Sequence, residues 1–221
     1  MKFDHCRLKA YQRASRSEFP DSLGLRVHRA LSWLERAEHC GDEDSAFIFL
    51  WISFNAAYAQ EIDRALGLGD RDLFRHFIVK LVEQDSQSLL YNHVWQEFSG
   101  PIRMLLDNPY VFHHFWSYQR GEIDSPTWRE RFSKANRAAK SALASVDTAK
   151  ILEVIFSRLY TLRNQLVHGG ATWRGGVNRD QIRDATTIMG KLVPSIIEVM
   201  MLNPNAFPGT ACYPVVKEEV A

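Results

Sequence analysis

The stretch from Phe47 to Ala59 most constrains how this chain folds, because it is apolar on nearly every side. Its sequence, FIFLWISFNAAYA, has only Ser53 and Asn55 as polar interruptions, and the acidic residues 42–44 precede it. A helix that is apolar all round is buried on several sides, and acidic residues suit a helix N-terminus. We therefore predict a central helix here. We interpret Asn55 as a core amide with its hydrogen bonds satisfied, or as a small-residue contact point, rather than as a catalytic group.

The spacing of apolar residues elsewhere along the chain is also helical. Apolar residues recur as on one face of an amphipathic helix in a segment that begins near Asp21 or Ser22 and stops before Gly41. The helical pattern continues from Asp70 to Asp107. No strand-like alternation persists in the sequence. We therefore predict an all-α protein.

Two proline-containing pairs predict where further helices begin. Asn108–Pro109 and Ser125–Pro126 each place a capping residue before a proline. Proline is favoured at the first helical position because it lacks the amide hydrogen that would be unpaired there. These pairs predict helices over residues 110–119 and 127–145.

Capping signals also predict the last two helices. Asp147 is the predicted cap of the helix that ends in the sequence HGG at 168–170. Asn178 and Gln181 form a predicted capping box for a final helix that ends near residue 202. Pro194 lies inside that helix and should kink it or leave one carbonyl without its usual partner.

Composition and charge limit the classes of function. Hydrophobic residues make up 46% and charged residues 24% of the chain, which is ordinary for a soluble globular protein. Lys plus Arg number 27 against 26 Asp plus Glu, a net charge of +1. The chain therefore lacks the broad basic field of a protein that binds nucleic acid non-specifically, and any RNA contact must be local.

The N-terminal sequence MKFDHCRLKAYQR carries charges throughout and lacks the apolar core of a signal peptide. No apolar run reaches the ~18–20 residues that a membrane helix needs. Cys6, Cys40 and Cys212 are far apart and odd in number, a pattern typical of reduced thiols rather than of disulfides or a zinc site. We expect a cytoplasmic protein with no membrane partner, no metal and no other cofactor.

The length of 221 residues suits one domain with a substantial core. Residues 1–20 are polar and aperiodic, and we interpret them as an arm that packs on the domain. The domain itself is predicted to span residues 21–202. Residues 203–221 are rich in proline and are predicted to form an irregular tail.

The stretch RNQLVHGG, from Arg163 to Gly170, combines side chains suited to chemistry with a clear structural context. On a helical wheel Ile155, Leu159, Leu162 and Leu166 form the core stripe, whereas Asn164 and His168 point away from it and Arg163 lies to its side. Tyr160 and Val167 are predicted to lie beside them, also away from the core. Such a face is suited to meeting a partner, and a second copy of the chain is the simplest candidate.

The R-N-x-x-x-H pattern of Arg163, Asn164 and His168, on a late helix of an all-α protein, resembles the HEPN superfamily (higher eukaryotes and prokaryotes nucleotide-binding). The stretch FLWISFNAAY at 49–58 is similar to the early core helix of bacterial HEPN proteins. The segments RASRSEFPDSLGLRVHRALSWLERAE and GGATWRGGVNRDQ are similar to an uncharacterised group of bacterial HEPN proteins of this length.

The resemblance implies a four-helix up-down bundle that forms a homodimer through the motif helices. In active members it implies a metal-independent endoribonuclease with a composite site in the dimer cleft. His168 would act as general base or acid at the 2′-hydroxyl or the leaving 5′-oxygen. Arg163 would hold the scissile phosphate, and Asn164 would orient His168 or contact phosphate. The products would be a 2′,3′-cyclic phosphate and a 5′-hydroxyl.

Other residues near the motif are candidate binding residues. Arg174 and Arg179 are placed to assist with phosphate, and Tyr160 shares the motif face. By analogy with the family, the biological setting is a stress response or phage defence, with a toxin-like effector and a possible protein regulator. The alternative function is a non-catalytic dimeric module that binds nucleotide, RNA or a protein partner through the same cleft.

Residues 70–146 exceed what a minimal HEPN bundle requires. We interpret them as inserted helices that shape a substrate groove, bind a partner or cover the cleft.

Structural roles are the alternative for several residues. Arg and His are favoured in the last turn of a helix, where they meet unpaired carbonyls and the negative end of the helix dipole. Adjacent histidines, as at His113–His114, point in different directions on a helix and do not suit a metal site. His93 is interpreted as a packing or surface residue. The basic run 129–140 is interpreted as a solvated face, with an RNA track as the alternative.

Overall fold

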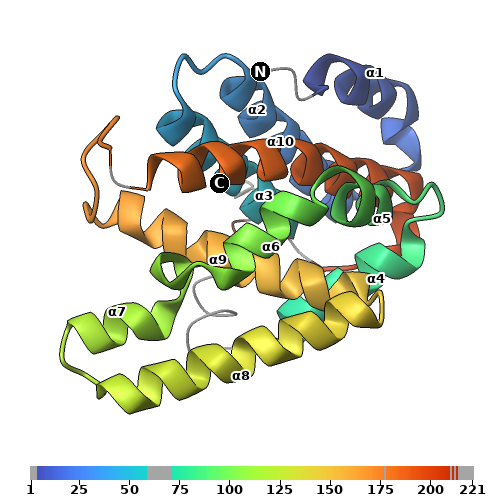
Figure 1. Ribbon diagram of the computed structural model, residues 1–221. Coiled ribbons are helices and arrows are strands. Elements are labelled where there is room, and N and C mark those ends of the chain that lie inside the picture. The colour runs from blue at the N-terminus through green and yellow to red at the C-terminus, as the bar shows by residue number, and fades with distance from the viewer. Residues whose placement is uncertain (1–3, 59–70, 177, 210, 212, 214–221) are drawn as a thin grey trace, which may run out of the picture.

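The computed structural model describes residues 4–58, 71–176, 178–209, 211 and 213, and throughout these residues the protein is helical without a strand (Figure 1). The predicted all-α fold class is therefore confirmed. The α-helices are α1 (His5–Ser15), α2 (Asp21–Glu38), α3 (Glu43–Tyr58), α4 (Arg71–Gln84), α5 (Leu89–Asn92), α6 (Ser99–Asp107), α7 (His113–Gln119), α8 (Ser125–Ala144), α9 (Thr148–Val167) and α10 (Arg179–Leu202). Short helical turns are η1 (Arg16–Glu18), the π-helical η3 (His93–Glu97), η4 (Pro109–Val111) and η5 (Pro204–Ala206).

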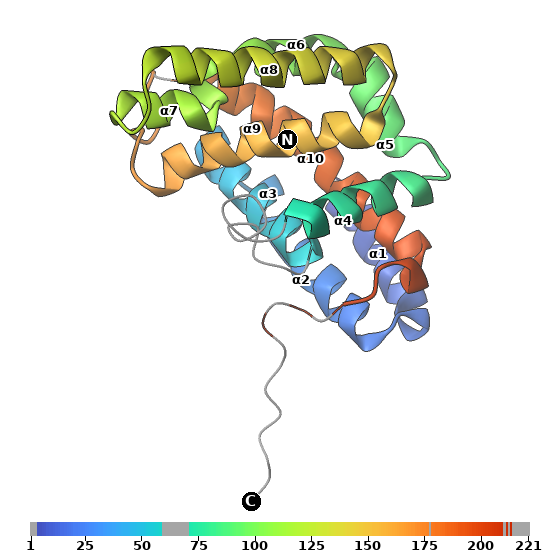
Figure 2. The ribbon, with the colours of Figure 1, turned by 90° about the horizontal axis from the view of Figure 1, so that it is seen from below.

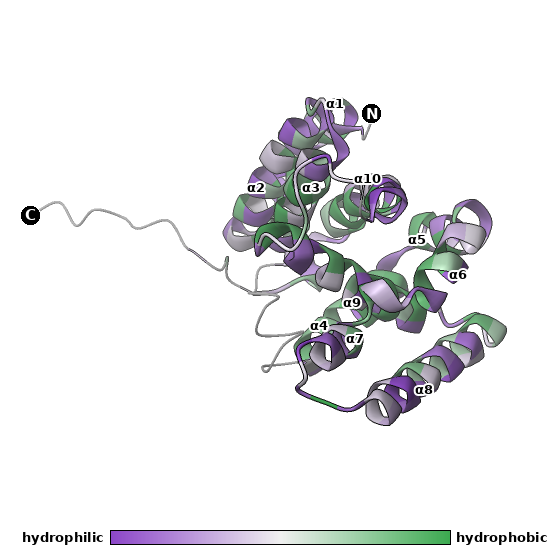
Figure 3. Cartoon of the chain, turned by 60° about the vertical axis from the view of Figure 1, so that its left-hand side comes forward, coloured by the Kyte–Doolittle hydropathy of each residue, from purple (hydrophilic) through white to green (hydrophobic). Residues whose placement is uncertain are grey.

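The helices form three layers, with α9 and α10 in the middle (Figures 1 and 2). Helices α1, α2 and α3 pack on one side of α10, and α6 and α8 pack on the outer side of α9. Helix α4 contacts both α9 and α10. Hydrophobic residues line the facing sides of α3 and α10, whereas α8 carries hydrophilic residues along its outer side (Figure 3). The middle layer therefore has protein on two sides, and α9 ends at the edge of the molecule.

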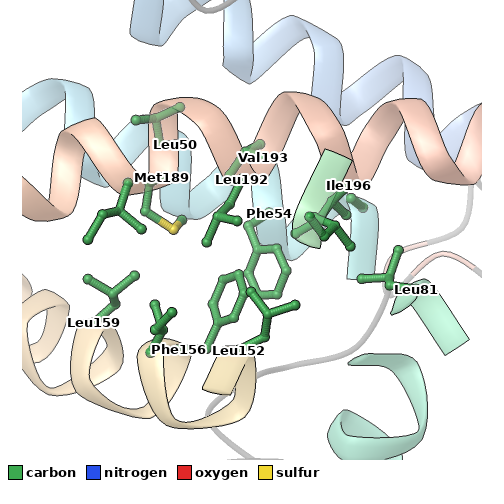
Figure 4. Packing of buried hydrophobic residues seen from close by; sticks show 14 of the residues in the cluster. Leu50, Phe54, Leu81, Leu152, Phe156, Leu159, Met189, Leu192, Val193 and Ile196 are labelled. Atoms are coloured by element: carbon green, nitrogen blue, oxygen red, sulfur yellow. The ribbon is translucent and has the colours of Figure 1, made fainter. Parts of the chain in front are cut away.

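The core is built where α3, α9 and α10 meet (Figure 4). The rings of Phe54 on α3 and Phe156 on α9 stack with centroids 4.1 Å apart and an interplanar angle of 18°. Leu159 on α9 and Leu192 on α10 close the same space, and both are buried. Burying one large apolar side chain contributes roughly 1.5–3 kcal/mol, so this three-helix contact is a main source of stability.

Helix α3 is buried on several sides, as its apolar sequence predicts. Phe47, Trp51 and Phe54 are buried toward α9 and α10, while Phe49 stacks on Trp33 of α2 with ring centroids 5.6 Å apart. The interpretation of Asn55 as a satisfied amide is wrong in one respect. Its Oδ1 is buried and makes no hydrogen bond with any described residue.

The N-terminal arm differs from the prediction, because residues 5–15 form helix α1 rather than an aperiodic segment. Leu8 and Gln12 are its only buried residues. Arg7 reaches Glu198 on α10 with two hydrogen bonds of 2.7 and 2.6 Å. A single buried leucine produces no apolar periodicity, so the helix depends on tertiary contacts that the pattern does not contain.

The predicted caps are partly correct. Asp147 accepts a hydrogen bond from the Lys150 backbone amide at 2.9 Å, as predicted. The cap of α8 is Asp124 rather than Ser125, since Asp124 accepts from the Thr127 amide at 2.9 Å. Asn108 caps the short turn η4, and α7 begins separately at residue 113.

The capping box predicted for the last helix is wrong. Asn178 has a left-handed backbone with φ of 59°, and its side chain makes no capping hydrogen bond. Its Nδ2 instead donates to Gln165 Oε1 of α9 at 2.6 Å. A tertiary contact has therefore replaced the local one.

Residues 70–146, interpreted as inserted helices, contribute to the same hydrophobic core as the rest of the chain. Their buried members include Ile78 and Leu81 of α4, Leu90 of α5 and Ile102 of α6. Gln165 Nε2 of α9 donates to the Tyr110 carbonyl at 2.7 Å. This segment therefore covers the outer side of α9 as far as Gln165.

Helix α10 is long and apolar enough to cross a membrane by length and composition, but 78% of its most apolar window is buried within the protein. Pro194 lies inside this helix, and the kink or unpaired carbonyl expected from it stays a prediction. The short turn η5 and the buried Phe207 follow α10 in the tail. Burial of this kind is typical of the core helix of a globular protein.

A buried arginine on α2 joins the tail to the core helix. Arg26 is 2% exposed and donates from Nε and Nη2 to the Ala57 carbonyl at 3.0 and 2.7 Å. Its Nη1 donates to the Phe207 carbonyl at 3.0 Å. Burial lowers the pKa of Arg26 to about 10, so the group remains a cation at neutral pH. It donates to a carbonyl in the last turn of α3, where carbonyls lie beyond the amides of the helix itself.

We expect Arg26→Met to lower the free energy of unfolding by about 2–4 kcal/mol, because the carbonyls of Ala57 and Phe207 would be left buried without a donor. Urea unfolding followed by circular dichroism measures this loss. Arg29→Met is the matched control on the same helix, since the partly exposed Arg29 donates to one carbonyl among the described residues, that of Tyr213 at 2.6 Å. Its expected loss is below about 1 kcal/mol, and equal losses in the two variants would contradict this account.

Candidate functional site

The motif Arg163, Asn164 and His168 lies in the last turn and at the C-cap of α9. Two glycines end the helix there. Gly169 has a φ of 71°, its amide donates to the Leu166 carbonyl at 3.2 Å, and the Gly170 amide donates to the Gln165 carbonyl at 2.7 Å. This pair of bonds is a Schellman motif, in which the residue after the cap takes the left-handed conformation that glycine adopts without strain.

The core stripe of α9 is as predicted for Ile155, Leu159 and Leu162, which are buried, whereas Leu166 is half-buried. His168 is exposed at the end of the helix. Val167 is 50% exposed.

The prediction for Tyr160 is wrong. Its ring lies 6.1 Å from that of Trp51 on α3 and packs against the core. Helix α3 contacts α9 on this side too, so the apolar contact is wider than the stripe alone indicates. Tyr160 is a partly buried packing residue rather than part of an outward face.

Arg163 and Asn164 form a pair within the motif. Arg163 Nη1 donates to Asn164 Oδ1 at 2.9 Å. Within the part of the chain that the structure describes, no hydrogen bond joins the side chains of Asn164 and His168. Asn164 therefore orients the guanidinium rather than the imidazole.

The loop after α9 is fixed by a carboxylate that the sequence did not single out. Asp44, in the first turn of α3, accepts from Arg179 Nη1 and Nη2 at 2.9 and 3.1 Å and from the Arg174 backbone amide at 3.1 Å. The paired geometry is the strong form of a charge-assisted hydrogen bond, and it raises the pKa of Arg179 above its ordinary value. The sequence alone predicts Asp44 only as an acidic residue at a helix N-terminus, because its partners are 130 or more residues away along the chain.

The two predicted phosphate-binding arginines therefore differ in their surroundings. Arg179 is committed to Asp44 and lies near Glu43, with Nη1 3.8 Å from Glu43 Oε2. Arg174 is exposed, and its guanidinium lies over the Trp173 ring at 4.7 Å from the centroid. Arg174 is the better placed of the two to meet a phosphate.

An apolar groove of about 470 Å³ lies between α3 and the end of α9. Its walls include Ile48, Phe49, Leu166, Val167, Ala171 and Trp173. The Trp173 side chain is 67% exposed, and its Nε1 donates to Asp42 Oδ1 at 3.3 Å. A second cavity, of about 530 Å³, lies between residues 41–43 on one side and residues 174–176 and Arg179 on the other. The motif end of α9 thus borders a hollow surface.

A second cluster of polar residues, which the sequence did not predict, lies where η3 meets α10. His93 Nε2 is 2.9 Å from Ser195 Oγ, and His93 Nδ1 is 3.3 Å from Glu97 Oε2. The order serine, histidine, carboxylate is that of an activated nucleophile. Such a nucleophile must be reachable by substrate, and Ser195 is only 7% exposed within α10. We interpret the cluster as a structural contact that holds η3 against α10.

Comparison with known proteins gives no match: no family model, curated protein or solved structure matches this chain. Among the described residues no group of three or more His, Cys, Asp and Glu side chains is placed to hold a metal ion. Cys6 and Cys40 are unpaired thiols, and Cys212 lies outside the described residues.

The half-buried His93 is expected to make stability depend on mild acid. Burial lowers its pKa below the ordinary value of 6.5, against the opposing effect of Glu97; Lys191 also lowers it and Asp85 raises it. Below about pH 6.5 the unfolded chain therefore binds a proton that the folded chain resists, so the free energy of unfolding falls as pH falls.

We expect His93→Gln to reduce this loss between about pH 7.5 and pH 5.5, because glutamine does not titrate. Each unit by which the pKa is lowered corresponds to about 1.4 kcal/mol. Urea unfolding at a series of pH values measures the effect. The exposed His76 provides the control, and His76→Gln should keep the native pH dependence; the same flattening in both variants would refute a special role for His93.

Proposed function

We propose that this protein is a metal-independent endoribonuclease whose active site forms between two copies of the chain. The observation that carries the proposal is the arrangement at the end of α9. An exposed imidazole, His168, follows a guanidinium, Arg163, that is oriented by Asn164 through a 2.9 Å hydrogen bond. The resemblance of this R-N-x-x-x-H pattern to HEPN proteins supports the same assignment.

Helix geometry favours a composite site. Arg163 and His168 are five residues apart, which corresponds to about 140° around the helix axis. One copy therefore does not direct both side chains at the same phosphate. Two α9 ends related by a two-fold axis would bring Arg163 of one copy toward His168 of the other. The half-exposed Val167 between them supplies apolar surface for such a contact.

The chemistry follows from the side chains. His168 of one copy accepts the proton of the RNA 2′-hydroxyl, and the 2′-oxygen attacks phosphorus. The bond from phosphorus to the 5′-oxygen breaks, and the second copy's His168 donates a proton to that oxygen. Arg163 stabilises the charge on the phosphoryl oxygens with its planar donors. The products are a 2′,3′-cyclic phosphate and a 5′-hydroxyl.

The surroundings suit a local contact with RNA. With a net charge of +1 the chain has no broad basic field, so affinity must come from a few placed groups. Arg174 on the Trp173 ring is the nearest candidate in the loop after the motif. The same arrangement of a guanidinium and an exposed aromatic suits a single-stranded substrate, because bases stack on aromatic rings.

We expect purified protein to cleave a mixed RNA pool in EDTA, and His168→Ala and Arg163→Ala to lower the rate by at least about 100-fold. Gel electrophoresis with end-group analysis measures the rate and identifies cyclic-phosphate ends. His76→Ala removes an exposed histidine on α4 and should leave the rate unchanged. Cleavage that survives loss of His168, or that requires a divalent metal, would contradict the proposed chemistry.

A second candidate function is a non-catalytic dimeric module that binds a protein or nucleotide. The apolar character of the groove that contains Phe49, Val167 and Trp173 favours it, because such walls suit a protein surface better than a phosphate chain. Absence of cleavage by a well-folded dimer would select this function over the ribonuclease.

Both candidates require the dimer, which can be tested by itself. We expect light scattering to give a dimer for the native chain and a shift toward monomer for Val167→Glu, because a buried unpaired carboxylate at the contact is costly. Val146→Glu is the matched control, since Val146 is 49% exposed in the turn before α9. A monomeric native chain, or equal behaviour of the two variants, would argue against a contact at the motif.

A further inference from the structure

We propose that a cavity between α8 and α9 is a binding site for a small organic anion, with Arg158 as the group that recognises it. The cavity has a volume of about 360 Å³, at the lower end of the range for small-molecule sites. Its walls are Phe74, Phe112, Ala135, Ala138, Lys150, Glu153, Val154, Ser157 and Arg158. None of these residues belongs to the motif at the end of α9, so the inference is independent of the proposed ribonuclease.

Arg158 is buried, with 3% exposure, and is poorly satisfied. Both of its hydrogen bonds come from Nη2 and are long, at 3.4 Å to the Leu106 carbonyl and 3.4 Å to Asn136 Oδ1. Its Nε is buried and has no hydrogen-bond partner among the described residues. The nearby Asp107 accepts from Asn136 Nδ2 at 3.1 Å, and Arg158 forms no ion pair with a described carboxylate. Asp107 acts on Arg158 by charge without contacting it, so the buried guanidinium has no directly bound anion among the described residues.

Arg26 shows what a purely structural buried arginine looks like in this protein. All three of its nitrogens donate to backbone carbonyls, at distances from 2.7 to 3.0 Å. Both arginines are almost fully buried. Arg158 differs in that it lines the cavity and keeps a buried Nε without a partner among the described residues. Burial alone therefore does not account for the environment of Arg158.

Two aromatic rings hold the Arg158 guanidinium in place and leave in-plane N–H donors for a ligand. The guanidinium carbon lies 4.5 Å from the Phe112 ring centroid and 5.5 Å from that of Phe132. A guanidinium that stacks on an aromatic ring keeps its in-plane donors available for hydrogen bonds. Although burial lowers its pKa to about 10, Arg158 stays protonated at neutral pH. An anion that enters in the plane can accept from the remaining donors.

The other walls define the class of ligand. Glu153 is paired with Lys150 at 2.7 Å and with Arg75 at 3.6 Å, so its charge is offset and the cavity remains net positive. Phe74 and Val154 provide an apolar wall, and the hydroxyl of Ser157 provides one more polar group. The fitting ligand is a small carboxylate or phosphate monoester with a compact apolar body.

The first test uses benzoate, phenyl phosphate and benzamide as probes of the native protein. Isothermal titration calorimetry measures affinity, and thermal unfolding measures the stabilisation that binding to the folded state produces. We expect benzoate or phenyl phosphate to bind and raise Tm, and the neutral benzamide to bind at least about tenfold more weakly. The two anions distinguish a carboxylate site from a phosphate site. Equal binding of benzamide, or no binding of either anion at millimolar concentration, would overturn the proposal.

Variants then locate the site. Arg158→Lys keeps the charge but loses the planar donors, and we expect affinity to fall by about ten- to a hundredfold. Ala135→Phe fills the cavity from α8 with Arg158 intact and should abolish binding, so the proposal stays testable if the arginine variant does not fold. Lys140→Gln removes a charge from α8 outside this cavity and should bind as the native chain does. Native affinity in Ala135→Phe would refute the location.

Discussion

The stacking of Phe54 on Phe156 fixes the rotation of α9 about its own axis, and the remaining features of that helix follow from this rotation. The rings lie 4.1 Å apart, and the Trp51 ring lies 6.5 Å from that of Phe156 on the same side. With Phe156 held against α3, Leu159 must face the core, one turn later. Arg158 is then directed to the opposite side of α9, where α8 packs. One aromatic contact thus gives α9 two faces with different chemistry.

The outer face of α9 is buried along most of its length and exposed at its C-terminal end, because the helices that cover it do not extend that far. Near Arg158 the helix is covered by α6, η4 and α8. The Arg158 side chain is therefore enclosed, and a cavity lies beside it. Toward the C-terminal end of α9, the covering segment still contacts the helix at Gln165, which donates a hydrogen bond to the Tyr110 carbonyl. Beyond Gln165, Val167 and His168 reach the surface. Residues 70–146 therefore act on α9 by covering most of it and leaving its end accessible.

Much of the fold could be predicted from the sequence because its strongest signals are local and periodic. The apolar run at 47–58 is a helix buried on several sides, and Asp147 caps the next-to-last helix as predicted. Features set by distant contacts could not be predicted. Helix α1 buries only Leu8 and Gln12. The Asn178 side chain donates a hydrogen bond to Gln165 instead of capping its own helix. In each of these cases a partner far away in the sequence decides the structure.

The same distinction applies to the two proposed sites. The Arg163, Asn164 and His168 pattern could be found because its residues are within six positions and two glycines mark the helix end. Arg158 is an arginine on the same helix as Arg163, yet the sequence alone predicts only an ordinary polar position of an amphipathic helix. Only the packing of Phe112 and Phe132 over it makes it a buried cation with unused donors. Because burial is a property of the neighbours and not of the residue, a site of this kind becomes visible only once the helices are assembled.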